Sequence, residues 1–237
     1  MTATDRRLAW DACLNVRDLG GLQCGDGVVR RGRLVRSSII GTLTPKGRAA
    51  MLAHGVRTVL DLRGDDEAAE TPSPYREGVT YRHVPFNSLR MFALHRAAHD
   101  GTLPDVLRAI AVPGGGLADA VGAIADAEPA IVLHCTAGRD RTGLVVAVVL
   151  AAIAVPDAEI VADYVASDDA LVEEYERFKA AHPERAADLD DGVAKRGWVM
   201  VETLATLRES FGGAAEYLHL AGVPPRQLAA IRAKLVA

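Results

Sequence analysis

The residues with the most chemical potential in this chain lie together in the ten positions from His134 to Gly143. Cys135 and Arg141 stand six positions apart there, with Gly138 between them. An apolar segment at 131–133 precedes them and a longer one at 144–155 follows, an order typical of a strand, a tight loop and a helix. Backbone N–H groups of such a loop converge at the helix N-terminus and bind anions. The pattern therefore predicts a reactive sulfur inside an anion site, which suits attack on a phosphate ester.

The spacing between cysteine and arginine is not specific by itself. Cys24 and Arg30 have the same separation, but the glycines at 25 and 27 flank an aspartate and predict a hairpin turn. No buried strand leads into Cys24 and no helix follows it, so we expect no nucleophile there. The alternative at Cys135, a buried cysteine beside a surface arginine, is disfavoured because strand, glycine and helix all accompany the spacing.

The ten residues read HCTAGRDRTG and resemble the active-site loop of the cysteine-dependent protein tyrosine phosphatases. They are most similar to the bacterial branch with tyrosine and phosphoinositide phosphatase activity, whose loop reads H-C-x-A-G-K-D-R-T-G. Four further segments resemble that branch: Asn15–Gly21, Val35–Ser38, Leu43–Gly47, and Gly55–Arg63 followed by Glu67. The resemblance spans about residues 15–175. Within the loop, the chain departs from this branch at one position, because Arg139 stands where the branch has lysine. The positive charge is kept, but a planar guanidinium replaces a compact ammonium group.

Hydrolysis in two in-line displacements is the chemistry that this loop predicts. The thiolate of Cys135 attacks phosphorus to give a phosphocysteine, and water then releases inorganic phosphate. Arg141 forks onto two phosphate oxygens, and Thr142 donates a hydrogen bond to the sulfur. The expected phosphate-binding residues are Thr136, Ala137, Gly138, Arg139, Asp140, Arg141 and Thr142.

The leaving group needs a proton, and three aspartates compete to supply it. Asp140 lies inside the loop and is the acid that the resemblance implies, although a helix N-cap is its alternative role. Asp105 follows a proline 30 residues before Cys135, as in the acid loops of other tyrosine phosphatases, but Pro-Asp is also common where helices begin. Asp61 ends a predicted strand and could serve as the acid or orient Arg141, or be a structural turn carboxylate.

Two more residues of the loop have alternative roles. We expect His134 to orient the loop, unless it is only a hydrogen-bonded core histidine. Arg139 is expected to contact a second anionic group of the substrate, with a solvated loop arginine as the alternative. In the N-terminal segment, Asn15, Arg17 and Asp18 match the family pattern and would otherwise be interpreted as turn and salt-bridge residues.

Three other classes of protein compete with a phosphatase. A metallohydrolase could use His95 and His99, which share one face of a predicted helix, but no third ligand accompanies them. A non-catalytic phosphate-binding module would have no need of both Cys135 and Arg141. A sulfur-transfer enzyme of the rhodanese type also uses a cysteine loop, but the arginine and threonine that follow fit a phosphatase better. We therefore expect no metal and no cofactor.

Composition and charge argue against several binding partners and cellular locations. The 237 residues carry a formal net charge of −4 and no basic run, so nucleic-acid binding is not expected. The three cysteines form no C-x-x-C pair, which favours a reducing compartment. The segment 1–11 is polar, and the longest apolar run has 12 residues, too few to span a bilayer. A cytoplasmic protein without a membrane span is therefore predicted.

The alternation of strands and helices predicts an α/β fold with a mainly parallel central sheet flanked by helices, like that of the tyrosine phosphatases. We expect one phosphatase domain over 1–237, with a possible helical lid at 87–117 and a mostly helical part at 157–237. Residues 64–78 are expected to form a loop. A helix is expected to begin at Thr44-Pro45 and to end at Gly55, and another to begin at Pro156-Asp157 and to reach about Ala166. The predicted substrates are phosphotyrosine proteins and also phosphoinositides; the alternative is a small metabolite phosphate.

Overall fold

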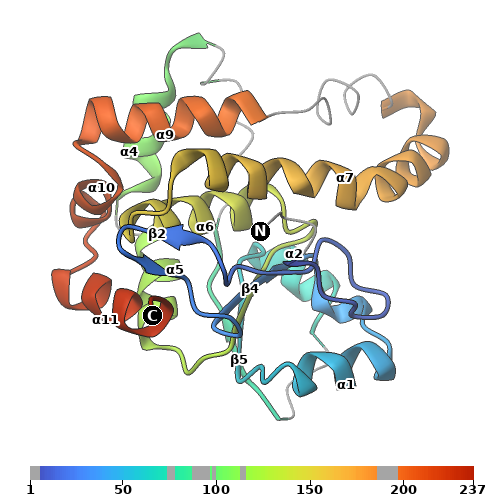
Figure 1. Cartoon of the computed structure of the whole chain (residues 1–237). Helices are drawn as coiled ribbons and strands as arrows, with labels where there is room; N and C mark the ends of the chain where they lie inside the picture. The colour runs from blue at the N-terminus through green and yellow to red at the C-terminus, as the bar shows by residue number, and fades with distance from the viewer. Residues whose placement is uncertain (1–5, 74–77, 87–96, 98–99, 113–115, 186–196) are drawn as a thin grey trace.

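The computed structural model describes residues 6–73, 78–86, 97, 100–112, 116–185 and 197–237. Within them, the main sheet has the strand order β1-β4-β7-β5-β6 (Figure 1). Its strands are β1 (Arg17–Asp18), β4 (Leu34–Ser37), β5 (Thr58–Asp61), β6 (Thr80–His83) and β7 (Ile131–His134). Only β1 is antiparallel to its neighbour. The predicted α/β fold with a mainly parallel sheet is confirmed.

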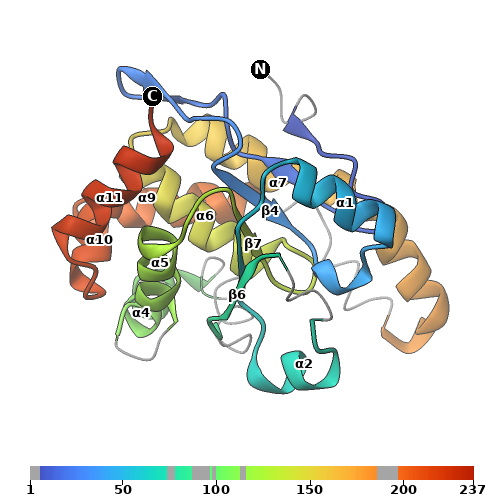
Figure 2. The same ribbon diagram turned by 90° about the horizontal axis from the view of Figure 1, so that it is seen from below.

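Helices cover both faces of the sheet. They are α1 (Pro45–Ala53), α2 (Asp65–Glu70), α4 (Leu103–Ile110), α5 (Leu117–Asp126), α6 (Asp140–Ala152), α7 (Asp157–Ala181), α9 (Gly197–Phe211), α10 (Ala214–Leu220) and α11 (Pro225–Leu235). Figure 2 shows α1 on one side of the sheet and α5 and α6 on the other. Side chains alternate along β7: Ile131 and Leu133 join the core under α5 and α6, whereas Val132 joins the core under α1.

Local sequence signals account for the elements that were predicted well. The hydroxyl of Thr44 accepts a hydrogen bond from the N–H of Gly47 at 3.1 Å and caps the N-terminus of α1. Beyond the C-terminus of this helix, Gly55 has a φ of 90°. Cys24 lies in the two-stranded hairpin of β2 (Gln23–Cys24) and β3 (Gly27–Val28), as its turn glycines predict. The expectation that Cys24 is not in a strand–loop–helix unit is therefore confirmed.

Two predictions about helices were wrong. Residues 64–78 contain α2, because three acidic residues in its first turn complement the helix dipole and Glu67 accepts a hydrogen bond from the N–H of Gly64 at 2.9 Å. The helix α7 runs to Ala181 rather than ending near Ala166. Its second half is polar and carries i,i+3 ion pairs such as Arg177–Glu174, a composition without the apolar periodicity that marks a helix.

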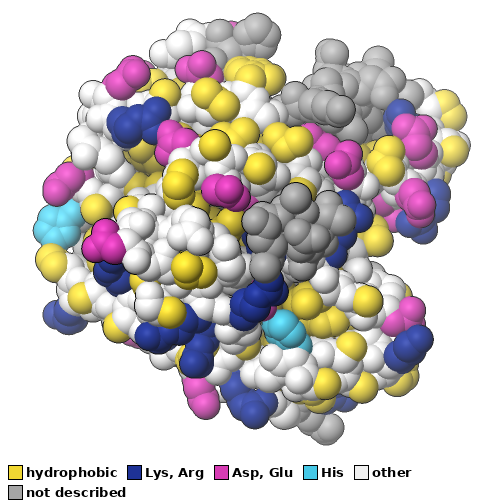
Figure 3. All heavy atoms as spheres, viewed as in Figure 1, with side chains coloured by type: hydrophobic (Ala, Val, Ile, Leu, Met, Phe, Trp, Pro, Cys, Tyr) yellow, Lys and Arg dark blue, Asp and Glu magenta, His cyan; other side chains and the backbone are white. Residues whose placement is uncertain are grey.

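The possible lid lies partly outside the described residues. Of the possible lid at 87–117, the structure describes α4 and its immediate surroundings, while 87–96, 98–99 and 113–115 lie outside the described residues. In the described part of the chain, none of the helices has both the length and the apolar character needed to cross a membrane. Basic and acidic side chains are interspersed with apolar ones on the face in Figure 3.

Candidate active site

The register of three neighbouring strands brings the candidate residues together. Ser37 at the end of β4 and Asp61 at the end of β5 both pair with His134 at the end of β7. The loop after β7 therefore lies between the segments that follow β4 and β5, at the carboxyl edge where open α/β sheets hold ligands. Cys135 begins this loop with 4% of its surface exposed, and α6 begins at Asp140.

Carbonyl groups of the loop accept hydrogen bonds from other segments, whereas its backbone N–H groups at 136–138 donate to none of the described residues. The carbonyl of Thr136 accepts a hydrogen bond from the N–H of Ile39 at 2.9 Å, and those of Ala137 and Gly138 accept from the Asn15 side chain at 3.0 and 3.1 Å. Among the described residues, no acceptor faces the backbone N–H groups at 136–138. Because each trans peptide directs its N–H opposite to its C=O, this division leaves a set of donors for an anion.

Gly138 allows the loop to lie this close to β4. Its φ is 68°, in the left-handed region, and a Cβ at this position would be 2.0 Å from the carbonyl oxygen of Ser37. No side chain can be accommodated there without moving backbone, so the glycine between Cys135 and Arg141 is a steric requirement.

Glu67 of α2 holds the guanidinium of Arg141. Two contacts join them, Nη1 to Oε2 at 2.5 Å and Nη2 to Oε1 at 2.8 Å, and the hydroxyl of Thr136 donates to Oε1 at 2.7 Å. The hydrogen bonds from Arg141 are the main reason that the pKa of Glu67 is lowered to about 2. Burial alone would lower the pKa of Arg141, but hydrogen bonds and charge from Glu67 and Cys135 raise it, so the sulfur and the guanidinium are neighbours.

The role of Glu67 was missed because residues 64–78 were interpreted as a loop. The sequence did contain a signal, since an acidic residue three positions after Gly64 is typical of a helix N-terminus. That signal predicts the helix but not the partner, because Arg141 is 74 residues away in the sequence.

Asp61 does not make the predicted contact with Arg141. It pairs instead with Arg63, at 2.6 Å from Oδ2 to Nη2, and accepts a hydrogen bond from Tyr81 at 2.7 Å. Burial alone would raise the pKa of Asp61, but hydrogen bonds from Arg63 and the nearby His134 lower it to about 2. A carboxylate with this pKa is ionised at neutral pH and has no proton to donate, so the interpretation of Asp61 as the acid is also disfavoured.

His134 is fully buried between the sheet and the loop. Its Nδ1 lies 3.1 Å from the carbonyl oxygen of Cys135 and donates to it, and its Nε2 is 3.8 Å from Oδ2 of Asp61. Burial lowers the pKa of the imidazole, which is consequently neutral at pH 7. The geometry fits the expected role in orienting the loop and equally satisfies a core histidine.

Arg139 is neither solvated nor directed at an unpaired anion. Its side chain is 2% exposed, its Nη2 lies 2.6 Å from Oδ1 of Asp168, and its guanidinium lies 5.9 Å from the centre of the Tyr164 ring. The alternative of a solvated loop arginine is wrong. A contact between its side chain and a second substrate anion would require breaking the pair with Asp168.

The three candidate acids have different surroundings. Asp140 is half-buried at the first residue of α6, and Tyr164 donates a hydrogen bond to its Oδ1 at 2.9 Å. The cap position itself is occupied by Arg139 and no side chain caps this end, so the N-cap alternative for Asp140 is wrong. Asp105 is 79% exposed on α4 and pairs with Arg108 of the same helix at 3.1 Å. Asp140 is the candidate that lies within the loop.

The remaining candidates from the sequence are Thr142 and the two suggested metal ligands, His95 and His99. The Thr142 hydroxyl is buried and, within the described chain, has no hydrogen-bond partner, so the predicted bond to the sulfur is not formed here. His95 and His99 lie outside the described residues. Among the residues that are described, no group of three histidine, cysteine or acidic side chains is placed to hold a metal ion.

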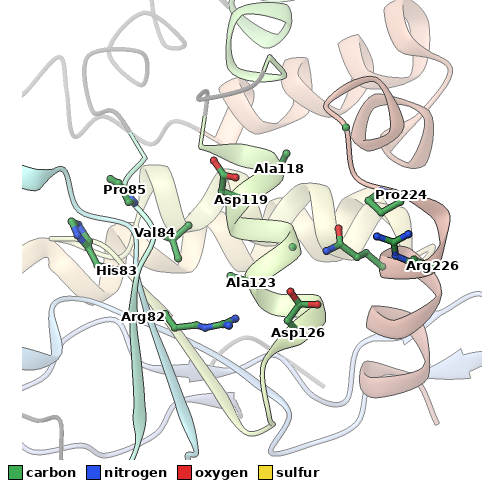
Figure 4. Close-up of a pocket in the computed structure, with 13 residues that line it drawn as sticks. Arg82, His83, Val84, Pro85, Ala118, Asp119, Ala123, Asp126, Pro224 and Arg226 are labelled. Carbon is green, nitrogen blue, oxygen red and sulfur yellow. The ribbon is translucent and has the colours of Figure 1, made fainter.

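A large cavity lies elsewhere, between β6, α5 and α11 (Figure 4). It has a volume of about 1060 Å³. Arg82 and Arg226 face it from two sides, and Asp119 and Asp126 from a third, so it offers two cations and two anions. This balance gives no preference for a phosphate, whereas the loop around Cys135 has the open backbone N–H groups at 136–138.

Comparison with known proteins agrees with this geometry. The model of the tyrosine phosphatase family matches residues 8–237. The triple specificity protein phosphatase PtpB of Mycobacterium tuberculosis is 29% identical over 82% of this chain and 87% of its own length. A tyrosine-protein phosphatase of Nostoc commune is 28% identical over 85% of this chain and 73% of its own. A structure of P. aeruginosa TpbA in complex with pTyr is 15% identical, covers 59% of this chain and 71% of its own, and has a TM-score of 0.34.

The fold and the loop define a class, the α/β proteins that place a thiol in a loop at the carboxyl end of a mainly parallel sheet. The family match then places this chain within that class: it belongs to the tyrosine phosphatase family. It is a protein-tyrosine-phosphatase-like hydrolase, with relatives named as phosphatases over most of its length.

Proposed function

We propose that this chain hydrolyses phosphate monoesters through a phosphocysteine on Cys135, and that phosphotyrosine is its principal substrate. The sulfur attacks phosphorus, the bond to the leaving oxygen breaks, and that oxygen takes a proton from Asp140. Water, losing a proton to Asp140, then displaces the sulfur and releases inorganic phosphate. The observation that carries the proposal is the loop around Cys135, with its carbonyls bonded, its N–H groups open and Arg141 held beside the sulfur.

The family and the relatives support the choice of substrate. Both relatives described above carry the name of a protein phosphatase, and the word "triple" in the name of PtpB indicates breadth in that enzyme. Phosphoinositides are proposed as secondary substrates on the resemblance of the loop alone, because the side chain of Arg139 is already paired with Asp168. A small metabolite phosphate remains the alternative. We further propose one catalytic domain working in the reducing cytoplasm, where its thiol stays reduced.

Trapping the intermediate tests this proposal directly. The wild type is incubated with p-nitrophenyl phosphate and a chelator, quenched in acid, digested and examined by mass spectrometry. We expect turnover that is insensitive to the chelator and a phosphate on the peptide containing Cys135. A folded wild type without turnover on aryl, peptide, lipid and metabolite phosphates would point to a binding protein. Turnover without any phosphorylated cysteine peptide would contradict the mechanism.

The contact between Tyr164 and Asp140 gives a separate prediction about the acid. Tyr164→Phe removes the hydrogen bond that fixes the carboxyl group, so we expect kcat to fall about 3- to 10-fold on phenyl phosphate, whose leaving group needs protonation. On p-nitrophenyl phosphate, whose leaving group is stable as an anion, we expect less than about a twofold change.

Tyr217→Phe is the matched control for this measurement. Tyr217 is also buried and donates its hydroxyl proton, at 2.8 Å, to the carbonyl of Leu107 on α4. The control should lose stability without changing the ratio of the two rates. Equal losses on both substrates in Tyr164→Phe would contradict a role for Tyr164 in placing the acid.

A further inference from the structure

A buried cluster of three arginines around one aspartate lies behind the loop. Asp163 of α7 pairs with Arg36 at 2.6 Å, with Arg6 at 3.1 Å and with Arg17 at 3.2 Å. The four side chains are each exposed by no more than 1%. Arg17 was predicted as a turn or family-pattern residue, and Arg36 was noted within a matching segment, but Asp163 was not singled out. Figure 1 shows α7, which supplies the aspartate, lying alongside α6.

This cluster is tied to the loop through its carbonyl groups. The Nη2 atom of Arg36 donates to the carbonyl oxygen of Gly138 at 2.7 Å and lies 3.3 Å from that of Arg139. Arg17 donates to the side-chain oxygen of Asn15, which holds the carbonyls of Ala137 and Gly138. The C=O of one residue and the N–H of the next belong to one planar peptide. The contacts of Asn15 therefore fix the N–H groups at 138 and 139, and those of Arg36 fix the N–H groups at 139 and 140.

The cluster is not balanced in charge. Three guanidinium groups face one carboxylate, so these four side chains carry an excess of two positive charges. Burial alone would raise the pKa of Asp163, but the charges of Arg17, Arg36 and Arg6 hold it well below its usual range. The nearby Asp18 does not restore the balance through an arginine, because its carboxylate accepts from the N–H groups of Gly20 and Gly32.

Excess buried charge costs stability, and packing alone would be served better by a balanced pair or by apolar residues. The cost is understandable if the charge acts on an anion. Arg36 donates to loop carbonyls on one side, and the same two peptides direct their N–H groups away from it, so Arg36 lies behind peptides that the proposed anion site would use.

We propose that Arg36, held by Asp163 and Ser167 of α7, is a positioning residue that sets the loop for phosphate. The inference rests on the proposed function only in that the loop binds a phosphoryl group. Arg36 touches neither sulfur nor substrate and acts through the carbonyls of Gly138 and Arg139.

Arg36→Lys and Arg6→Lys form a matched pair for the test. Both replace a buried guanidinium that pairs with Asp163, but among the described contacts only that of Arg36 reaches the loop carbonyls. For Arg36→Lys we expect the dissociation constant of inorganic phosphate, measured by calorimetry, to rise about 10- to 100-fold, with a similar loss in kcat/KM on p-nitrophenyl phosphate. For Arg6→Lys we expect both to stay within about threefold, with a comparable fall in the urea midpoint.

A second variant and the binding measurement test the inference if Arg36→Lys does not fold or the wild type has no turnover. If Arg36→Lys does not fold, Ser167→Ala removes the hydroxyl that holds Arg36 at 3.2 Å and should weaken phosphate binding about threefold. If the wild type binds phosphate but has no turnover, the proposed function fails while the binding measurements still report on Arg36. Equal effects of the two lysine substitutions, or phosphate binding unchanged in Arg36→Lys and in Ser167→Ala, would overturn the inference.

Discussion

Replacing Cys135 by serine is expected to reduce turnover of p-nitrophenyl phosphate by about 10⁴-fold or more, to the background rate. A serine hydroxyl keeps its proton at neutral pH, so the first displacement loses its nucleophile. The loop N–H groups, Arg141 and Glu67 all remain. The variant should therefore still bind inorganic phosphate, which calorimetry can measure alongside the rate.

Cys24→Ser provides the control for this substitution. Cys24 has the same spacing to Arg30 as Cys135 has to Arg141, and it is equally enclosed, with no exposed surface. It lies in the hairpin of β2 and β3, so its replacement should lower stability and leave kcat unchanged. Substantial turnover by Cys135→Ser, or loss of turnover in a folded Cys24→Ser, would contradict the assignment of the nucleophile.

Replacing Arg141 by lysine is expected to lower kcat/KM by about 10³-fold. An ammonium group cannot make the two parallel hydrogen bonds that the guanidinium now makes with Glu67, nor fork onto two oxygens of the transferring phosphoryl group. Because the charge is kept, ground-state attraction of phosphate is partly retained. We therefore expect the larger share of the loss in kcat, measured from full saturation curves.

Two variants separate the orientation of the Arg141 guanidinium from its positive charge. Glu67→Gln keeps Arg141 but weakens what orients it, and we expect about a tenfold loss in kcat/KM. Arg6→Lys changes another buried guanidinium that pairs with a carboxylate, that of Asp163, and should lower stability with less than about a threefold change in kcat/KM. A loss in Arg141→Lys no larger than in Arg6→Lys would contradict a direct role for Arg141.

The elements predicted well are those whose signals are contiguous. Thr44 caps the helix that its neighbour Pro45 begins, and β7 and α6 flank the loop as the apolar segments around it predict. The helix α2 and the second half of α7 were missed because both are polar and exposed. Their stability comes from caps, ion pairs and the helix dipole, which leave no apolar period in the sequence.

The sequence by itself determined the segment of the candidate site: Cys135, Gly138 and Arg141 are close in the chain, and the strand before them and the helix after them are present as predicted. It could not determine their partners. Glu67, Arg36 and Tyr164 reach the loop from other elements, and Asp163 holds Arg36. These contacts depend on the register of β4, β5 and β7 and on the packing of α7. Hydrogen bonds between distant segments depend on where strands end and helices cross. Those positions are set by packing of the whole core, which no local pattern of residues encodes.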